Sequence, residues 1–349
     1  MAYTDIDDPT LYFSSTIWTG NGVDDRNIVI DGTGMQPDFV WIKSRNDTDN
    51  HRLVDSVRGA TKHLESDGTG AEQTSSNVKA FTSTGVTLST NGSVNANSEL
   101  YASWSWKAGT SFTNDASATG IGTIDSAGSV NNDSGFSIVS YTGTGSNGTV
   151  KHGLNSVPKM FIVKELSNAN SWEVYHVSQG AGKNAQLNTT AAFESAGSSR
   201  WNSTAPTSSV FSIGTDSGVN RSSSNFITYC FAEKQGYLKT GKWIGNGNND
   251  GPFSFCGFKP AFIMIKRTDV AKNWYINDNL RLGYNVNNPY ISPNITAAET
   301  GGTEIDILSN GFKIRASGTG HNQSGGTYIY MAIAENPFVT STGVPATAR

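Results

Sequence analysis

The sequence has few charged residues, few cysteines and no long apolar run. Only 15% of its 349 residues are charged, and the formal net charge is -4. A chain without a basic excess lacks the field that neutralises phosphates, so the composition argues against sequence-independent binding of DNA or RNA. The longest apolar runs, such as 39–42 and 261–265, are far shorter than the roughly 20 residues of a membrane-spanning helix. No membrane span is predicted.

The two cysteines, Cys230 and Cys256, are too few for a disulfide scaffold and have no metal-ligand spacing. The first residues include neither a basic stretch nor an apolar one, so no secretory signal is predicted and we expect the protein to fold in a cytoplasm. Thiols stay reduced there, and both cysteines are therefore predicted to be small buried apolar side chains. A disulfide between them is the less favoured alternative.

Glycine, serine, threonine and asparagine are used heavily, with a normal share of aromatic residues. That mixture predicts many short strands joined by polar turns, and argues against long helices and against disorder. The length allows two or three domains that each bury a core.

A proline-led apolar strand ending in lysine occurs three times. The copies are Pro37-Asp-Phe-Val-Trp-Ile-Lys43, Pro158-Lys-Met-Phe-Ile-Val-Lys164 and Pro260-Ala-Phe-Ile-Met-Ile-Lys266. Each reads as a strand buried on both faces, since its apolar run leaves no polar side, and proline at the start of a strand costs no ladder hydrogen bond.

The surroundings of these strands repeat as well. His51, Trp172 and Trp274 each follow the proline of their copy by fourteen residues. An aromatic strand closes each copy, at 101–106, 226–233 and 328–335, and weaker alternating stretches lie at 85–88, 210–213 and 311–314. The interval from Pro158 to Ala232 equals that from Pro260 to Ala334, 74 residues. Copies two and three therefore share one frame.

A turn rich in glycine and asparagine precedes each proline-led strand. The three turns are Trp18-Thr-Gly-Asn-Gly22, Tyr141-Thr-Gly-Thr-Gly145 and Trp243-Ile-Gly-Asn-Gly247. Asn-Gly and Gly-rich pairs adopt the positive φ of tight hairpins, so a hairpin is predicted at each.

These patterns predict an all-β protein of three tandem antiparallel β-sandwich or jelly-roll-like units, at 1–109, 110–235 and 236–349. Below, these ranges are called segments 1, 2 and 3. Residues 109–133, rich in Gly, Ser, Asn and Asp, are expected to form the longest linker or loop, and the second boundary is placed near Gly236.

The repeated motifs resemble a repeat domain of virion proteins of marine tailed phages, of the cyanophage type. The resemblance runs through YFSSTIWTGNG, QPDFVWIKSRN, DSVRGATKHLESDGTGAE and YASWSWKAG in segment 1, and through GFSIVSYTGTG, VKHGL, PKMFIVKE, NFITYCFAEK, GFKPAFIMIK and TYIYMAIAENPF in the others. It covers nearly the whole chain. The resemblance implies a virion structural or tail-fibre-like protein and brings no catalytic or ligand residues with it.

Several patterns in the sequence resemble reactive sites, but none of them has the context that such a site needs. Gly143-Thr-Gly-Ser-Asn-Gly148 satisfies G-x-G-x-x-G, but a strand and not a helix is expected after it, so it is interpreted as a turn. The five histidines show no metal-ligand spacing. They are His51, His63, His152, His176 and His321. No serine lies in a G-x-S-x-G elbow. No catalytic, cofactor-binding or metal residue is therefore predicted, and no cofactor.

A polysaccharide-cleaving enzyme would need a pair of carboxylates across a sugar. The candidates are Asp55, Glu165, Glu173 and Asp278. Their surroundings repeat poorly, and no enzyme activity is predicted. Exposed aromatic rings could instead stack on sugars. Trp172 and Trp274 are expected to fill the cores of their own sandwiches, whereas Trp201, flanked by Arg200 and Asn202, and Tyr275 are the predicted surface or ligand contacts.

The sequence therefore predicts a non-enzymatic structural protein of a tailed-phage virion, assembled in the host cytoplasm and displayed on the tail or head. The expected partners are other virion proteins and further copies of the chain, with a trimer as the guess, because sandwich edges can be covered by neighbours. The alternative is an adhesin that binds a host-surface glycan. Tail fibre, baseplate and capsid remain open as positions.

Overall fold

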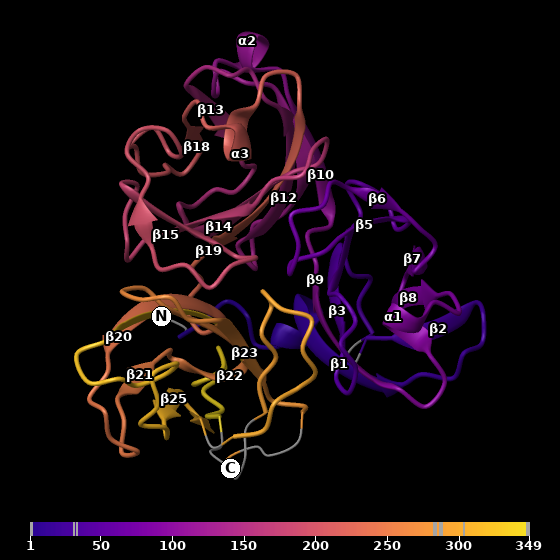
Figure 1. Cartoon of the computed structure of the whole chain (residues 1–349), viewed down its shortest axis with the longest axis vertical. Coiled ribbons are helices and arrows are strands. Elements are labelled where there is room, and N and C mark those ends of the chain that lie inside the picture. Colours follow the sequence, from indigo (N-terminus) through magenta and orange to yellow (C-terminus); the bar gives the residue numbers. More distant parts are fainter. Residues whose placement is uncertain are drawn as a thin grey trace.

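A computed structural model describes residues 3–30, 32, 34–281, 285, 289–302 and 304–346. The chain is all-β, with antiparallel sheets, and the helices among the described residues are single turns between strands. Figure 1 shows three groups of strands, coloured indigo to purple, magenta to red and orange to yellow, around a common centre. These groups follow segments 1, 2 and 3 in order.

Each segment contributes one main sheet and one smaller sheet. In segment 1 the main sheet has the order β1 (Phe13–Thr19), β9 (Leu100–Trp106), β3 (Phe39–Ser44), β4 (Arg52–Asp55), β5 (Lys62–Leu64) and β6 (Gln73–Thr74). The smaller sheet has the order β2 (Arg26–Val29), β8 (Gly85–Leu88) and β7 (Val78–Thr82). A buried apolar cluster between them joins residues of both sheets, among them Val40 and Val86.

Segment 2 has the longest sheet. Its order is β10 (Thr110–Asn114), β11 (Ser126–Asn131), β12 (Phe136–Thr142), β19 (Asn225–Ala232), β14 (Pro158–Glu165), β15 (Trp172–His176), β16 (Lys183–Gln186) and β17 (Glu194–Ser195). The smaller sheet pairs β13 (Gly148–Lys151) with β18 (Val210–Ile213). A second enclosed cluster, which includes Phe161 and Phe211, lies between these two sheets.

Segment 3 repeats the arrangement with fewer strands. The main sheet has the order β20 (Leu238–Ile244), β26 (Thr327–Pro337), β22 (Phe258–Arg267) and β23 (Trp274–Asp278). The smaller sheet has the order β21 (Phe253–Phe255), β25 (Gly311–Ile314) and β24 (Ile305–Leu308). The short helices of the chain are η1 (Pro9–Leu11), α1 (Gly92–Asn95), α2 (Ala116–Thr119) and α3 (Ser217–Asn220).

The predicted repeat is present in the strand pairing. In every segment the proline-led strand pairs antiparallel with the later aromatic strand, and the same positions meet. Trp41 faces Trp104, Ile162 faces Tyr229 and Met264 faces Met331. The strands β3, β14 and β22 are buried almost throughout, as their apolar sequences predict. In segment 3 the proline lies inside the strand at a bulge, where register shifts on both sides of Pro260.

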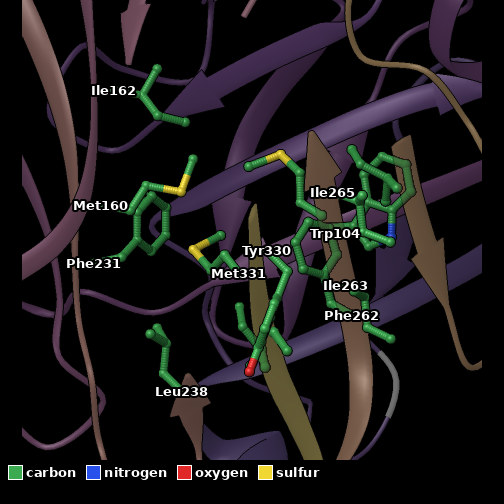
Figure 2. Packing of buried hydrophobic residues seen from close by; sticks show 14 of the residues in the cluster. Trp104, Met160, Ile162, Phe231, Leu238, Phe262, Ile263, Ile265, Tyr330 and Met331 are labelled. Atoms are coloured by element: carbon green, nitrogen blue, oxygen red, sulfur yellow. The ribbon is translucent and has the colours of Figure 1, made fainter. Parts of the chain in front are cut away.

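The inner faces of the three main sheets meet in one shared aromatic core. Phe39 of segment 1 stacks on Tyr229 of segment 2 with ring centroids 4.3 Å apart. Trp106 of segment 1 lies 5.7 Å from Phe262 of segment 3 and 6.3 Å from Phe231 of segment 2. Figure 2 shows this packing, with side chains of all three segments in contact. Each main sheet is thus covered on both faces, which accounts for strands that are apolar throughout.

Two sequence interpretations were wrong. Residues 109–133 do not form a loop, since they contain β10, α2 and β11, which extend the main sheet of segment 2. The glycines there serve close packing: a Cβ at Gly128 would lie 1.9 Å from the carbonyl oxygen of Ile138 on the paired strand. The small residues of this stretch, which by composition resemble a linker, are therefore needed for the close approach of β11 to β12.

The glycine-rich turns are also not tight hairpins, because each carries the chain from the main sheet to the smaller one. Their positive φ is confirmed at Gly22, Gly145 and Gly247. A buried asparagine fastens each turn. Asn220, for example, accepts the N–H of Thr144 at 2.8 Å and donates to the carbonyl of Gly214 at 2.7 Å. Asn95 and Asn322 hold the other two turns in the same way.

We predict that Asn220→Ala lowers the free energy of unfolding by about 1–3 kcal/mol, because it leaves polar backbone groups of the turn without partners. Urea unfolding followed by tryptophan fluorescence measures the change. Asn225→Ala, at an exposed position with one exposed side-chain bond, is the control and should change stability by less than half as much. Equal losses in both variants would contradict the role of Asn220.

Candidate functional site

Trp201 is not on the surface. Its side chain is fully buried in the inner cluster of segment 2, its ring lies 4.9 Å from that of Phe161, and its Nε1–H donates to the carbonyl of Lys183 at 3.1 Å. The predicted exposed ring is therefore wrong, because an arginine beside a tryptophan indicates a solvated stretch only where the arginine itself faces solvent. Arg200 instead pairs with Glu173 and Asp216 inside the fold.

Tyr275 is buried as well, with 7% of its surface exposed. Its ring lies 4.3 Å from the imidazole of His321 and 5.0 Å from the ring of Tyr290. Burial raises the pKa of its hydroxyl to about 12. The structure therefore does not bring Trp201 and Tyr275 together, since they lie in segments 2 and 3, and neither offers an exposed ring face to a ligand.

The carboxylates considered for sugar cleavage are held by structural partners. Glu165 accepts hydrogen bonds from Asn168, Asn170 and Arg221. Burial alone would raise the pKa of Glu165, but these hydrogen bonds bring it below the ordinary value.

Glu173 lies on β15 and is 1% exposed. Asn184 and Gln186 donate to its two oxygens at 2.7 and 3.2 Å, and Arg200 forms an ion pair with it at 3.0 Å. Burial raises its pKa despite the attraction of Arg200. Both glutamates therefore fasten loops of segment 2 to its strands.

The G-x-G-x-x-G turn of segment 2 has its polar backbone groups engaged within the chain. The N–H of Gly145 donates to the backbone carbonyl of Asn220 at 2.8 Å, and the N–H of Thr144 donates to the side-chain oxygen of Asn220. Strand β13 begins at the last glycine of the motif, Gly148. A phosphate site would need free N–H groups at a helix start, so this motif forms a turn between two sheets.

The contacts that join the segments form the most organised polar site in the described part of the chain. Three ring nitrogens, one from each segment, donate to a backbone carbonyl of a neighbouring segment. Trp172 donates to Glu65 at 2.9 Å, and Trp274 donates to Gln186 at 3.1 Å. These residues link segment 2 to segment 1 and segment 3 to segment 2.

His51 closes the ring from segment 1 to segment 3. The N–H of Trp41 donates to Nδ1 of His51 at 2.9 Å, so the hydrogen of the neutral imidazole lies on Nε2. That nitrogen donates to the carbonyl of Ser292 at 3.2 Å. Burial lowers the pKa of His51 to about 3, which keeps the ring neutral. The three residues that share one spacing thus make the same bond around a closed cycle. Trp172 and Trp274 are buried core residues, as predicted, and the core that they fill is shared by the three segments.

The lines of contact between neighbouring segments are called seams. The lysine that ends each proline-led strand is buried near them. Lys164 donates to Asn170 within segment 2 at 2.9 Å and to Thr69 of segment 1 at 3.2 Å. Lys266 donates in the same manner to Lys272 and to Thr190 of segment 2. Burial lowers the pKa of Lys164 to about 8 and that of Lys266 to about 7. Lys164 and Lys266 each tie a loop of their own segment to a loop of the preceding one, whereas Lys43 donates to the carbonyls of Ser44 and Asp47 within segment 1.

Two aspartate–arginine pairs complete the seams. Asp55 pairs with Arg58 at 2.5 Å and accepts the hydroxyl of Tyr229 from segment 2 at 2.8 Å. Asp278 pairs with Arg281 at 2.7 Å and accepts Nε1–H of Trp104 from segment 1 at 2.9 Å. Segment 2 has a histidine at this position. The Nε2–H of its His176 donates to the carbonyl of Tyr330 in segment 3 at 3.2 Å.

Sequence reasoning missed the arginines and the asparagines of these sites. The available signal was spacing, because Arg58 and Arg281 each follow their proline by 21 residues, as His51 and Trp274 follow theirs by fourteen. Once a repeat is fixed by its apolar strands, polar residues at equal offsets are candidates for equal contacts.

A groove of about 600 Å³ runs along the seam between segments 1 and 2. Its polar lining includes Arg58, Glu72, Asp125 and Asn225. It is bordered by the β10–β11 hairpin on one side and by the loop after β4 on the other.

Cys230 and Cys256 are free and buried, as predicted. Within the described ranges no three histidine, cysteine, aspartate or glutamate side chains are grouped as metal ligands. No helix among those residues has the length and apolar character for a membrane span.

Sheets, seams and shared core define an all-β protein of antiparallel sheets closed around one aromatic centre. The chain belongs to the family described as "Domain of unknown function (DUF7483)", whose model matches residues 8–337. A comparison with curated proteins found no match.

We predict that Trp172→Phe destabilises the protein by about 1–2 kcal/mol more than Trp106→Phe. Both rings are buried in the shared core and both changes remove the same volume, but only Trp172 donates a hydrogen bond. Trp106 Nε1 has no hydrogen-bond partner among the described residues. Urea unfolding of the two variants measures the difference, and equal losses would show that the bond to Glu65 contributes nothing.

Acid should weaken the closed ring through His51. Its folded pKa is lowered to about 3, below the 6.5 of the unfolded chain, so the unfolded state binds the proton first. The stabilisation is complete above pH 6.5 and is lost as the pH falls towards 3. In His51→Gln, which keeps a donor and an acceptor, the free energy of unfolding should fall less steeply from pH 6.5 to 4. Parallel pH profiles of the two proteins would contradict this assignment.

Proposed function

We propose that the chain is a non-enzymatic structural protein of a tailed-phage virion, displayed on the tail or head surface and acting through contacts with other virion proteins. The closed cycle of buried seams carries the proposal. His51 of segment 1 donates to the carbonyl of Ser292 in segment 3, so each segment contacts both of the others. No segment lies at an open end of the array, where local unfolding would begin. Such local closure suits a particle protein that lacks disulfides.

The proposal includes the finer architecture of three tandem sandwich or jelly-roll-like units derived from one ancestor. Its support is the recurrence of the same stacked aromatic pair in each segment. Trp18 lies over Tyr101 at 5.5 Å, and Tyr141 lies over Phe226 at 5.1 Å. Trp243 lies over Tyr328 at 5.1 Å. Equal offsets, equal strand pairing and equal contacts together favour divergence from one unit over three unrelated sheet pairs.

The polar residues that an enzyme would need are engaged in holding loops and seams, as Glu165 and Glu173 illustrate. Side chains that are fixed in this way favour a structural role, in which the protein works through surface contacts and not through a reactive site. Further copies of the chain are proposed as partners, with a homotrimer as the first state to test.

A host-glycan adhesin is the second candidate, and the groove along the seam of segments 1 and 2 favours it. Its acidic and amide side chains could accept and donate hydrogen bonds to sugar hydroxyls. The aromatic rings first considered for stacking are buried, so recognition would have to be polar.

Cryo-electron microscopy of intact particles of the phage that encodes the chain tests the main proposal. We expect density that fits the three-lobed chain at a fixed number of copies on the tail or head. Absence of the chain from purified particles, measured by mass spectrometry, would overturn the proposal.

Binding of the purified chain to host envelope glycans separates the adhesin from the purely structural role. If the chain binds, Asn225→Arg at the rim of the groove should weaken binding strongly, because it fills the opening without touching a buried seam. New reducing ends after incubation with host polysaccharide would instead identify an enzyme.

A further inference from the structure

The three segments differ at one edge. In segment 2 the hairpin of β10 and β11 covers strand β12, with β11 antiparallel to it from Ser126 opposite Tyr141 to Asn131 opposite Phe136. Just before β11, Ile124 bridges Val150 of β13, the edge strand of the smaller sheet. The hairpin thus closes the open side of the sheet pair.

The corresponding edge of segment 3 has no such hairpin in the described chain. Its first part is occupied by the chain itself, because Lys234 bridges Leu238 through two main-chain hydrogen bonds. Strand β20 corresponds to β12, because Leu238 and Phe136 occupy the same place beside the aromatic strand. Its main-chain N–H groups at even positions point away from the sheet, as the bond from Thr240 N–H to the carboxylate of Glu233 at 2.9 Å shows. By alternation, Lys242 and Ile244 present N–H and C=O groups at the free edge.

A cavity of about 490 Å³ lies beside this edge, between β20 and β21. It is lined by Leu238, Lys239, Phe255 and Cys256, among others. In segment 2 the equivalent space is filled by the hairpin, since Val130 and Ile124 are each 6% exposed and belong to the inner cluster. Val130 lies opposite Ser137, the position that Lys239 occupies in segment 3.

Large apolar side chains gather at the same edge. Ile244 on β20 is 66% exposed, and Phe253 and Phe255 on β21 are 44% and 56% exposed. Exposed apolar residues next to unpaired main-chain groups are the features of a strand-addition site.

We propose that the β20–β21 edge of segment 3 binds an extended strand of another polypeptide, antiparallel to β20 at Lys242 and Ile244, so that the end of the strand borders the cavity beside Lys239. The occupant resembles β10 and β11, which supply this cover in segment 2. A second copy that offers its own β20 fits less well, because pairing Lys242 with Ile244 of that copy would place a glycine, Gly247, opposite Lys239. The site does not depend on the proposed virion role.

Charge defines the partner further. Glu233 and Lys239, which both line the cavity, form an ion pair at 3.2 Å, whereas Lys234 at the cavity and Lys242 on the exposed part of the strand add positive charge to the edge. The hairpin of segment 2 carries Asp115 and Asp125, both exposed, at the two sides of its turn. A strand flanked by acidic residues therefore complements the edge, and long-range attraction should weaken with salt.

A labelled peptide of residues 109–132 tests the site on the full-length chain, with fluorescence anisotropy as the readout. We expect saturable binding to the unaltered chain and to Lys242→Thr. Lys242→Pro should bind about tenfold more weakly or worse, because proline removes the outward N–H without disturbing the pairing of β20 with β26. Circular dichroism checks that both variants keep the fold.

Changes in the peptide keep the test independent of the folding of any variant. Ala127→Pro in the peptide should abolish binding, because residue 127 faces Ser140 of β12 within the chain and would face Lys242 at this edge, and proline lacks the N–H for that pairing, whereas Ala127→Ser should retain it. Absence of saturable binding to the unaltered chain would overturn the proposal. Equal affinity for the Lys242→Thr and Lys242→Pro variants would also overturn it. In that case the peptide would be displacing residues 109–132 of the chain from β12, and not binding at β20.

Discussion

The structure depends on one constraint: where three sheets that are covered on both faces meet, most of the buried polar groups need hydrogen-bond partners. Burial of an amide or hydroxyl without a partner costs about 1–3 kcal/mol, so the seams cannot be left to apolar contact alone. The ring nitrogens of His51, Trp172 and Trp274 meet this demand at three equivalent places. Because the bonds run in one direction around the core, the third bond also joins the first segment to the last.

The three segments meet that constraint with different side chains. Histidine replaces tryptophan at the seam between segments 1 and 3, and it keeps one donor towards the neighbour by using its other nitrogen as an acceptor for Trp41. Segment 2 has His176 where the other two segments have an aspartate paired with an arginine. What persists is a hydrogen bond across the seam, while the side chain that makes it changes. The constraint therefore acts on polar satisfaction more than on residue identity.

Much of the fold could be predicted from the sequence, because its strongest signals are local. Continuous apolar runs and equal offsets identified the paired central strands, and the repeat predicted that His51, Trp172 and Trp274 are equivalent. The shared core could not be predicted, because a strand buried within its own sandwich and one buried against a neighbour have the same composition. Trp201 was misplaced for a related reason: an arginine beside it indicates solvent unless its partners, here Glu173 and Asp216, are known.

Glycine was the least informative signal, since it serves two opposed purposes in this chain. In the turns it supplies positive φ, as at Gly145, and polar glycine-rich sequence there does mean a turn. In β11 the same residue type lets two strands approach, because no Cβ fits between Gly128 and Ile138. A sequence cannot separate these uses without the partner strand. The asymmetry among the segments follows from this hidden strand: a repeat that closes into a ring leaves each copy one lateral edge, and only segment 2 covers its edge with a hairpin of its own.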